Sequence, residues 1–151
     1  MPQRPARIGF LLAQLGAHAA DIFAEQTRSL GITPSEAGVI RIVARNPGIS
    51  QRALADRLGA VQSRVVTLVD RLESAGLVSR TRSESDRRMQ LLALTNAGES
   101  MLGGLRQAAE EQEKQLTSGF TEEQKTALFE LLSALGAARG LDAEVHPGYR
   151  S

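Results

Sequence analysis

A cluster of polar residues between positions 62 and 67 has the side-chain types that read base edges in DNA. Gln62, Ser63, Arg64 and Thr67 fall within about two helical turns of one another. Glutamine can pair with adenine and arginine with guanine, and a threonine methyl group can pack on the methyl group of thymine. An ordinary solvated helix surface would carry similar residues, so this cluster alone leaves both interpretations open.

A second cluster, the stretch SESDRR, places Asp86, Arg87 and Arg88 in a polar segment that leads into an apolar run. Two adjacent arginines on a projecting loop can reach a phosphate or a narrow, electronegative minor groove. The carboxylate of Asp86 could hold one guanidinium in place through a charge-assisted hydrogen bond. The ordinary alternative is an exposed ion pair, which contributes under about 1 kcal/mol.

Charge is distributed unevenly along the chain, although its net charge is only +1. The window from residue 50 to residue 95 contains eight arginines, no lysine and five acidic residues, which gives it a net charge of +3. The planar fork of arginine binds two acceptors at once, so arginine suits phosphate and base-edge contacts better than lysine. The window therefore favours a nucleic-acid partner without establishing one.

The elements around the two clusters predict how they are positioned. Val65, Leu68, Val69 and Leu72 recur at helical spacing, so they form a buried stripe that leaves the first polar cluster on the opposite, exposed side. A short helix capped by Ser50 precedes this helix. The segments 77–82 and 89–94 read as two strands that carry the second cluster at their tip. A short helix, a tight turn, an amphipathic helix and a basic hairpin make a winged helix-turn-helix.

The remaining segments predict flanking helices within a single domain of 151 residues. We expect a mainly α fold with a small β-hairpin wing, in which a winged helix-turn-helix lobe is flanked by dimerisation helices at both ends. The expected parts are an N-terminal dimerisation helix at 6–30, the lobe at 33–95, two dimerisation helices within 96–140 and a loose tail at 141–151.

Several functional classes are poorly supported by the composition. The chain has no cysteine, which excludes disulfides, thiolate metal sites and thiol nucleophiles. Its two histidines, His18 and His146, lie far apart, and no phosphate-binding loop is present. We therefore expect no catalytic residues, no metal, no cofactor and no enzymatic activity. No signal peptide or membrane span is apparent, and we expect a cytoplasmic protein without membrane association.

Three stretches carry a specific combination of residues: LADRLG at 54–59, VTLVDRLESAGLVSR at 66–80 and DRRMQLLALTNAG at 86–98. In these stretches the sequence resembles the MarR family of bacterial transcription regulators. The resemblance implies that the helix carrying Gln62, Ser63, Arg64 and Thr67 enters the major groove. It also implies that Arg87 and Arg88 reach the minor groove with Asp86 in support. Val61 departs from the family pattern, which often has a small polar capping residue there, so the helix could begin less firmly.

The resemblance also implies a homodimer with interlocking terminal helices, double-stranded DNA with a palindromic operator as partner, and a small aromatic or anionic effector. Candidate effector contacts are His18, Arg28 and Arg41, although an ordinary surface charge on a helix is the favoured interpretation of each. Symmetry independently favours the dimer, since two recognition helices read a palindrome. We expect a repressor released from DNA by its effector. The alternative is a winged helix that serves as a protein-interaction scaffold, which would favour apolar residues at Ser63 and Thr67.

Overall fold

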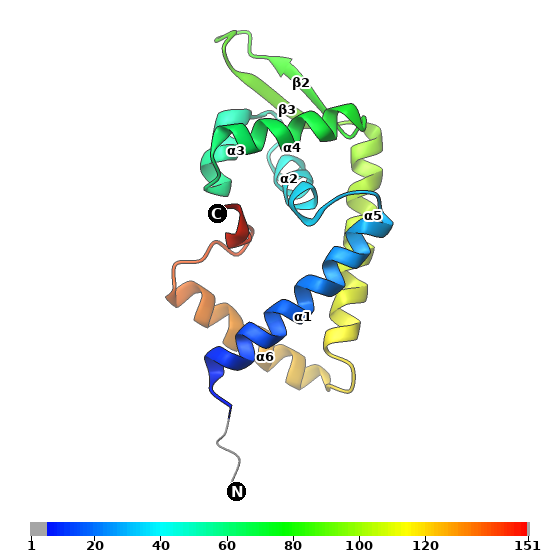
Figure 1. The fold of residues 1–151 in the computed structure, drawn as a ribbon, viewed down its shortest axis with the longest axis vertical. Helices are drawn as coiled ribbons and strands as arrows, with labels where there is room; N and C mark the ends of the chain where they lie inside the picture. Colours follow the sequence, from blue (N-terminus) through cyan, green and yellow to red (C-terminus); the bar gives the residue numbers. More distant parts are fainter. Residues whose placement is uncertain (1–5, 151) are drawn as a thin grey trace, which may run out of the picture.

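The computed structural model describes residues 6–150, without the side chains of Pro147 and Arg150, and is mainly helical (Figure 1). Its elements follow the expected order, with one additional short strand. They are α1 (Ile8–Ser29), α2 (Pro34–Arg45), β1 (Ile49–Ser50), α3 (Gln51–Leu58), α4 (Gln62–Ser74), β2 (Val78–Arg82), β3 (Gln90–Leu94), α5 (Asn96–Leu116), α6 (Glu122–Ala138) and a 3₁₀ turn, η1 (Pro147–Arg150).

The hydrophobic core lies in the lobe formed by α2, α3, α4 and the sheet. Ile40, Leu54, Leu58, Val65 and Leu92 are fully buried there. Helix α2 begins with a complete capping box, in which the Thr33 hydroxyl accepts a hydrogen bond from the Glu36 amide and the Glu36 carboxylate accepts one from the Thr33 amide. The capping box marks where α2 begins, and the buried apolar residues mark the faces on which the helices of the lobe pack, so the local and tertiary signals agree.

The sheet has three strands in the order β1-β3-β2, whereas the sequence predicted only a hairpin. Strands β2 and β3 pair antiparallel with Arg80 opposite Leu92, and β1 pairs with the other edge of β3. The additional strand is two residues long, so it has no alternating pattern from which it could be predicted. It attaches the base of the wing to the start of α3.

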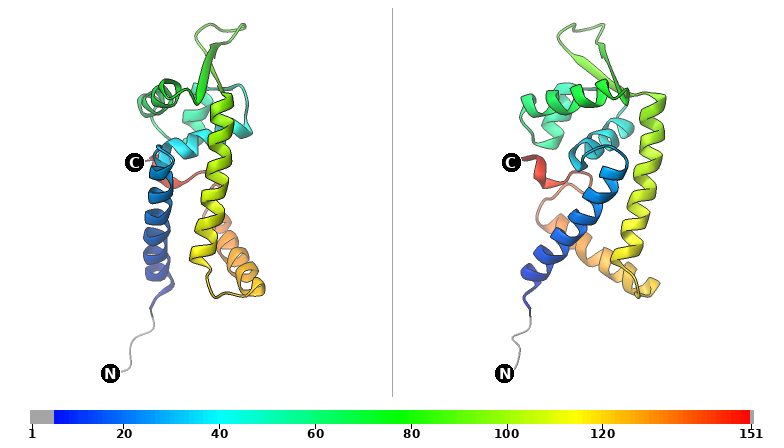
Figure 2. Two further views of the ribbon diagram at one scale, coloured as in Figure 1. Left: turned by 90° about the vertical axis from the view of Figure 1, so that its right-hand side faces the viewer. Right: turned by 45° about the vertical axis from the view of Figure 1, so that its right-hand side comes forward.

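Helices α1, α5 and α6 extend away from the lobe on the side opposite to the wing (Figures 1 and 2). The Gln112 side-chain amide on α5 donates a 2.7 Å hydrogen bond to the Ala19 carbonyl on α1. Helix α6, in contrast, buries none of its residues. Among residues 6–150, no helix combines the length and the apolar character needed to cross a bilayer.

The end of the chain differs from the expected loose tail. Residues 142–150, here called the C-terminal strap, return from α6 to the lobe and contact α2, α3 and α4. Tyr149 in the strap is buried, and Val145 packs against the lobe core. The segment is mostly polar, so its composition did not predict that Tyr149 would be buried against the lobe.

Candidate nucleic-acid interface

Helix α4 presents the first polar cluster as expected from its buried stripe. Val65, Leu68, Val69 and Leu72 are buried, and Gln62, Ser63 and Thr67 are exposed. The Thr67 hydroxyl donates a 3.0 Å hydrogen bond to the Ser63 carbonyl, which leaves the threonine methyl group available for apolar contact. Val61 occupies the N-cap position in an extended conformation and makes no side-chain cap hydrogen bond. The Arg64 amide donates a 3.1 Å hydrogen bond to the Val61 carbonyl, so the first-turn amides that remain available to an anion such as a phosphate are those of Gln62 and Ser63.

Arg64 is positioned differently from the other residues of this cluster. It is half-buried, and its Nη1 donates 3.2 Å hydrogen bonds to the carbonyls of Gly148 and Tyr149 in the C-terminal strap. Its guanidinium carbon lies 5.6 Å from the centre of the Tyr149 ring, within cation–π range. The structure therefore directs Arg64 toward the strap rather than outward with Ser63 and Thr67.

The wing tip carries Arg87 and Arg88 as exposed side chains. The tip is closed by hydrogen bonds from the Ser83 amide to the Met89 carbonyl, 3.0 Å, and from the Met89 amide to the Asp86 carbonyl, 2.9 Å. A carboxylate oxygen of Asp86 accepts a 3.0 Å hydrogen bond from the Arg88 backbone amide. The expectation that Asp86 holds a guanidinium is thus corrected, because its carboxylate instead closes the backbone turn that carries both arginines.

Arg80 on β2 makes a network that the sequence analysis did not anticipate. Its guanidinium lies 2.6 Å from the Asp70 carboxylate and 2.9 Å from the Glu73 carboxylate on α4, and its Nε donates to the Gln51 side-chain oxygen at 3.1 Å. Only 19% of the Arg80 side chain is exposed. Arg80 therefore joins the wing to α4 and α3. The sequence shows two acidic residues one helical turn apart, at 70 and 73, and an arginine at 80, but only the fold shows that these side chains meet.

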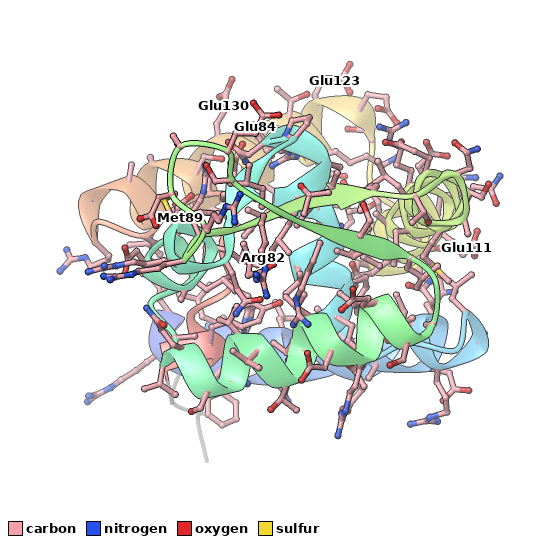
Figure 3. All side chains as sticks on the ribbon, turned by 90° about the horizontal axis from the view of Figure 1, so that it is seen from above. Arg82, Glu84, Met89, Glu111, Glu123 and Glu130 are labelled. Carbon is pink, nitrogen blue, oxygen red and sulfur yellow. The ribbon has the colours of Figure 1, made fainter. Side chains whose placement is uncertain are left out.

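A groove of about 470 Å³ lies between the wing and α4. In the view of Figure 3, Arg82 lies between the wing strands and α4, while Glu84 and Met89 lie nearer the wing tip. The exposed Arg82 makes this groove a further candidate contact for a polyanion, although no sequence motif marks Arg82 as a contact residue. The groove is lined by Gln51, Val66, Glu73, Arg80, Arg82 and Gln90.

The candidate effector residues lie on α1 and α2, and two of them have partners of their own. Arg28 pairs with Glu25 one turn earlier on α1, and His18 is exposed. The Arg41 guanidinium lies 5.0 Å from the centre of the Phe23 ring, and burial lowers the pKa of Arg41 below its usual value. None of the three lines the groove between the wing and α4. The role of His18, Arg28 and Arg41 in effector binding stays a prediction.

No group of three or more metal-ligating side chains is found within residues 6–150. The two carboxylates of α4 that lie toward the wing, those of Asp70 and Glu73, are both paired with Arg80, and the Asp86 carboxylate at the wing tip accepts from the Arg88 amide. The chemistry of this region is therefore that of arginine, amide and hydroxyl groups, which bind phosphates and base edges.

Comparisons with known proteins place this arrangement among transcription regulators. Residues 30–89 match the model of the MarR family. The chain is 34% identical over 109 residues to a protein named as a transcriptional regulatory protein for the hcr operon of Thauera aromatica, covering 72% of this chain and 66% of that protein, just under two thirds of its length. It is also 34% identical over 97 residues to the HTH-type transcriptional regulator BilQ of Clostridium symbiosum, covering 64% of this chain and 67% of BilQ.

Solved structures share the fold over most of its length. The transcriptional repressor CouR bound to a 23-mer DNA duplex is 30% identical, with a TM-score of 0.76, and the match covers 86% of this chain and 92% of CouR. Bordetella bronchiseptica BpsR, whose DNA binding is regulated by 6-hydroxynicotinic acid, has a TM-score of 0.72, and the match covers 90% of this chain and 98% of BpsR. At 20% identity, BpsR shows a common fold only. The mainly α architecture with a small wing sheet is confirmed.

Proposed function

Because this chain belongs to the MarR family of winged helix-turn-helix transcription regulators, we propose that it is a homodimeric repressor that binds a palindromic operator and leaves it when a small-molecule effector binds. Proteins of this family bind DNA and regulate transcription, and they are not enzymes. One observation carries the proposal for this chain: the exposed face of α4 stands beside a wing whose tip presents Arg87 and Arg88. Such a pair suits adjacent major and minor grooves of one duplex.

The homodimer is supported by apolar side chains that the single chain leaves uncovered. On α6, Phe129 and Leu131 are 73% and 70% exposed, and on α1, Ile8 and Phe10 are 73% and 61% exposed. Helices α1 and α6 overlap in Figure 1 but are separated in the left view of Figure 2, so neither covers the other. Large exposed apolar faces of this kind mark protein interfaces. A second copy of the chain is the occupant we propose.

Release by an effector follows from coupling between two arrangements of the dimer. In one arrangement the spacing of the two lobes fits the operator, and in the other it does not. A ligand that binds the second arrangement more tightly than the first weakens DNA binding, at most by the ratio of its two affinities. The relative BpsR has its DNA binding regulated by 6-hydroxynicotinic acid, an aromatic acid. For this chain we propose a small aromatic or anionic effector, with His18, Arg28 and Arg41 as candidate contacts, and a cytoplasmic location where DNA is accessible.

The proposed operator recognition is tested by selecting duplexes from a random DNA pool with the full chain. The expected product is a palindrome whose half-sites are about one helical turn apart. Binding to it should weaken steeply as salt concentration rises, because phosphate contacts release counterions. Failure to enrich any sequence would contradict specific reading and would favour the protein-interaction scaffold instead.

Replacing Arg88 with alanine is expected to weaken binding to specific and unrelated duplexes by a similar factor, because a wing-tip arginine at the minor groove acts mainly through its charge, on the groove and the phosphates that border it, rather than through hydrogen bonds to base edges. The slope of log affinity against log salt should become shallower by about one unit. Fluorescence anisotropy with labelled duplexes at several salt concentrations measures both effects. The matched control is Arg106→Ala, which removes an exposed arginine from α5. An unchanged slope in Arg88→Ala would show that Arg88 makes no phosphate contact.

A further inference from the structure

The C-terminal strap is anchored by Tyr149, which packs on α2 over Gly38 and bonds to Ser35; this site on α2 is here called the seat. The Tyr149 hydroxyl donates a 2.5 Å hydrogen bond to the Ser35 carbonyl. Its ring passes over Gly38, where a Cβ atom would overlap with the tyrosine hydroxyl. Only 6% of Tyr149 is exposed. The seat therefore depends on glycine at position 38, although glycine is unfavourable inside a helix.

The seated strap holds arginines of the lobe that would otherwise face solvent or DNA. Arg64 donates to two strap carbonyls and covers the Tyr149 ring, as described above. The Glu144 carboxylate pairs with Arg57 on α3 and, at 2.9 Å, with Arg45 on α2. The strap thus adds a carboxylate to a lobe whose cationic charge attracts DNA.

Arg64 cannot give its Nη1 to the strap and to a base edge in the same orientation. A bidentate contact with guanine requires two neighbouring N–H groups of the guanidinium fork to face the two acceptors of the base. In the seated state, Nη1 is directed at the carbonyls of residues 148 and 149 and the guanidinium lies against the Tyr149 ring. A base contact through Nη1 therefore requires Arg64 to leave the strap.

We propose that the C-terminal strap is an autoinhibitory segment that competes with operator DNA for Arg64, so that Tyr149 leaves its seat when the operator binds. This inference rests on the proposed function. Because Nη1 can donate either to the strap or to a base, DNA and the strap are linked reciprocally in this proposal: whatever unseats Tyr149 strengthens DNA binding, and DNA binding unseats Tyr149.

Blocking the seat from either side tests the competition. We expect Gly38→Ala and Tyr149→Ala each to raise operator affinity about fivefold or more, within the usual range of coupling between two sites. Tyr149→Phe is the matched control, because it keeps the ring and loses only the hydrogen bond to Ser35, so its effect should be smaller. The effects of Gly38→Ala and Tyr149→Ala should not add in the double variant, since both remove the same contact. Alanine favours the helix at position 38, so thermal unfolding should show an intact fold.

Tyr149 also reports directly on the seat, because it is the chain's only tyrosine and the chain has no tryptophan. Burial raises the pKa of Tyr149 to about 12, against a smaller opposing effect of the Arg64 and Arg41 guanidinium groups. Seating favours the neutral phenol, so the strap should stay seated below about pH 10 and be released as pH rises toward 12. Gly38→Ala should return the pKa of Tyr149 toward about 10, which an alkaline absorbance titration measures.

Fluorotyrosine incorporation gives a single fluorine NMR signal, which should shift on addition of the selected operator duplex and move toward the signal of Gly38→Ala. An unshifted signal at saturating operator would overturn the competition. So would an operator affinity that is unchanged or weaker in Gly38→Ala and Tyr149→Ala; a weaker affinity would mean that the strap positions Arg64 for DNA. If neither the parent nor the variants bind any duplex, the proposed function itself fails, whereas a parent that binds tightly with unaffected variants contradicts only the strap.

Discussion

Replacing Leu131 with glutamate is expected to dissociate the dimer and to weaken operator binding by about 10²–10⁴-fold, the range over which linked binding sites gain from acting together. Leu131 is 70% exposed in the single chain and lies on the apolar stripe of α6 with Leu128, Leu132 and Leu135. In a two-fold interface the substitution is present twice, so two carboxylates would be buried without partners. Each half-site would then be bound by a separate chain.

Sedimentation at micromolar concentration should show a species of 16.2 kDa for Leu131→Glu and twice that mass for the parent. Ala137→Glu is the matched control, because it adds the same charge to an exposed position on the side of α6 opposite the leucine stripe, two turns beyond Phe129, and should leave mass and affinity unchanged. A parent chain that sediments as a monomer, or a Leu131→Glu variant that remains a dimer, would contradict an interface built on α6.

The parts of the fold that could be predicted from sequence are those set by residues close together in the chain. The stripe of Val65, Leu68, Val69 and Leu72 predicted the buried face of α4, and the Thr33–Glu36 and Thr121–Gln124 capping boxes are local sequence patterns that stand where α2 and α6 begin. These signals act within one or two helical turns, so no tertiary knowledge is needed to interpret them. The exposed positions of Gln62, Ser63 and Thr67 follow from the same stripe.

The features that could not be predicted depend on contacts between distant residues. Tyr149 bonds to Ser35 across 114 residues, and Gly38 gives no sign in the sequence that an aromatic ring will cover it. Asp86 was expected to pair with an arginine side chain, yet it accepts from a backbone amide two residues away, because aspartate readily closes such turns. Charge and proximity in the sequence identify candidate partners, and the backbone geometry decides among them.

The second large effect is expected at Arg80, whose replacement by alanine should weaken operator binding by about 100-fold, since like charges brought together at an interface cost several kcal/mol. Arg80 neutralises Asp70 and Glu73, which lie on α4 beside the groove that faces the wing. Without Arg80, both carboxylates would face the phosphates of a bound duplex. The wing would also lose its polar connection to α4, so its arginines would no longer be held at one distance from the recognition helix.

Anisotropy titrations of Arg80→Ala and Arg80→Lys separate these two contributions. Lysine keeps the positive charge but cannot reach both carboxylates with a fixed fork, so Arg80→Lys should recover part of the affinity. Adding Asp70→Asn and Glu73→Gln to Arg80→Ala removes the repulsion and should recover more, while any remaining loss reports the wing position. Thermal unfolding of each variant distinguishes weakened binding from a weakened fold, because the pairs are partly exposed and contribute only modestly to stability. If Arg80→Ala is folded and binds the operator as tightly as the parent, neither charge compensation nor wing placement by Arg80 supports DNA binding.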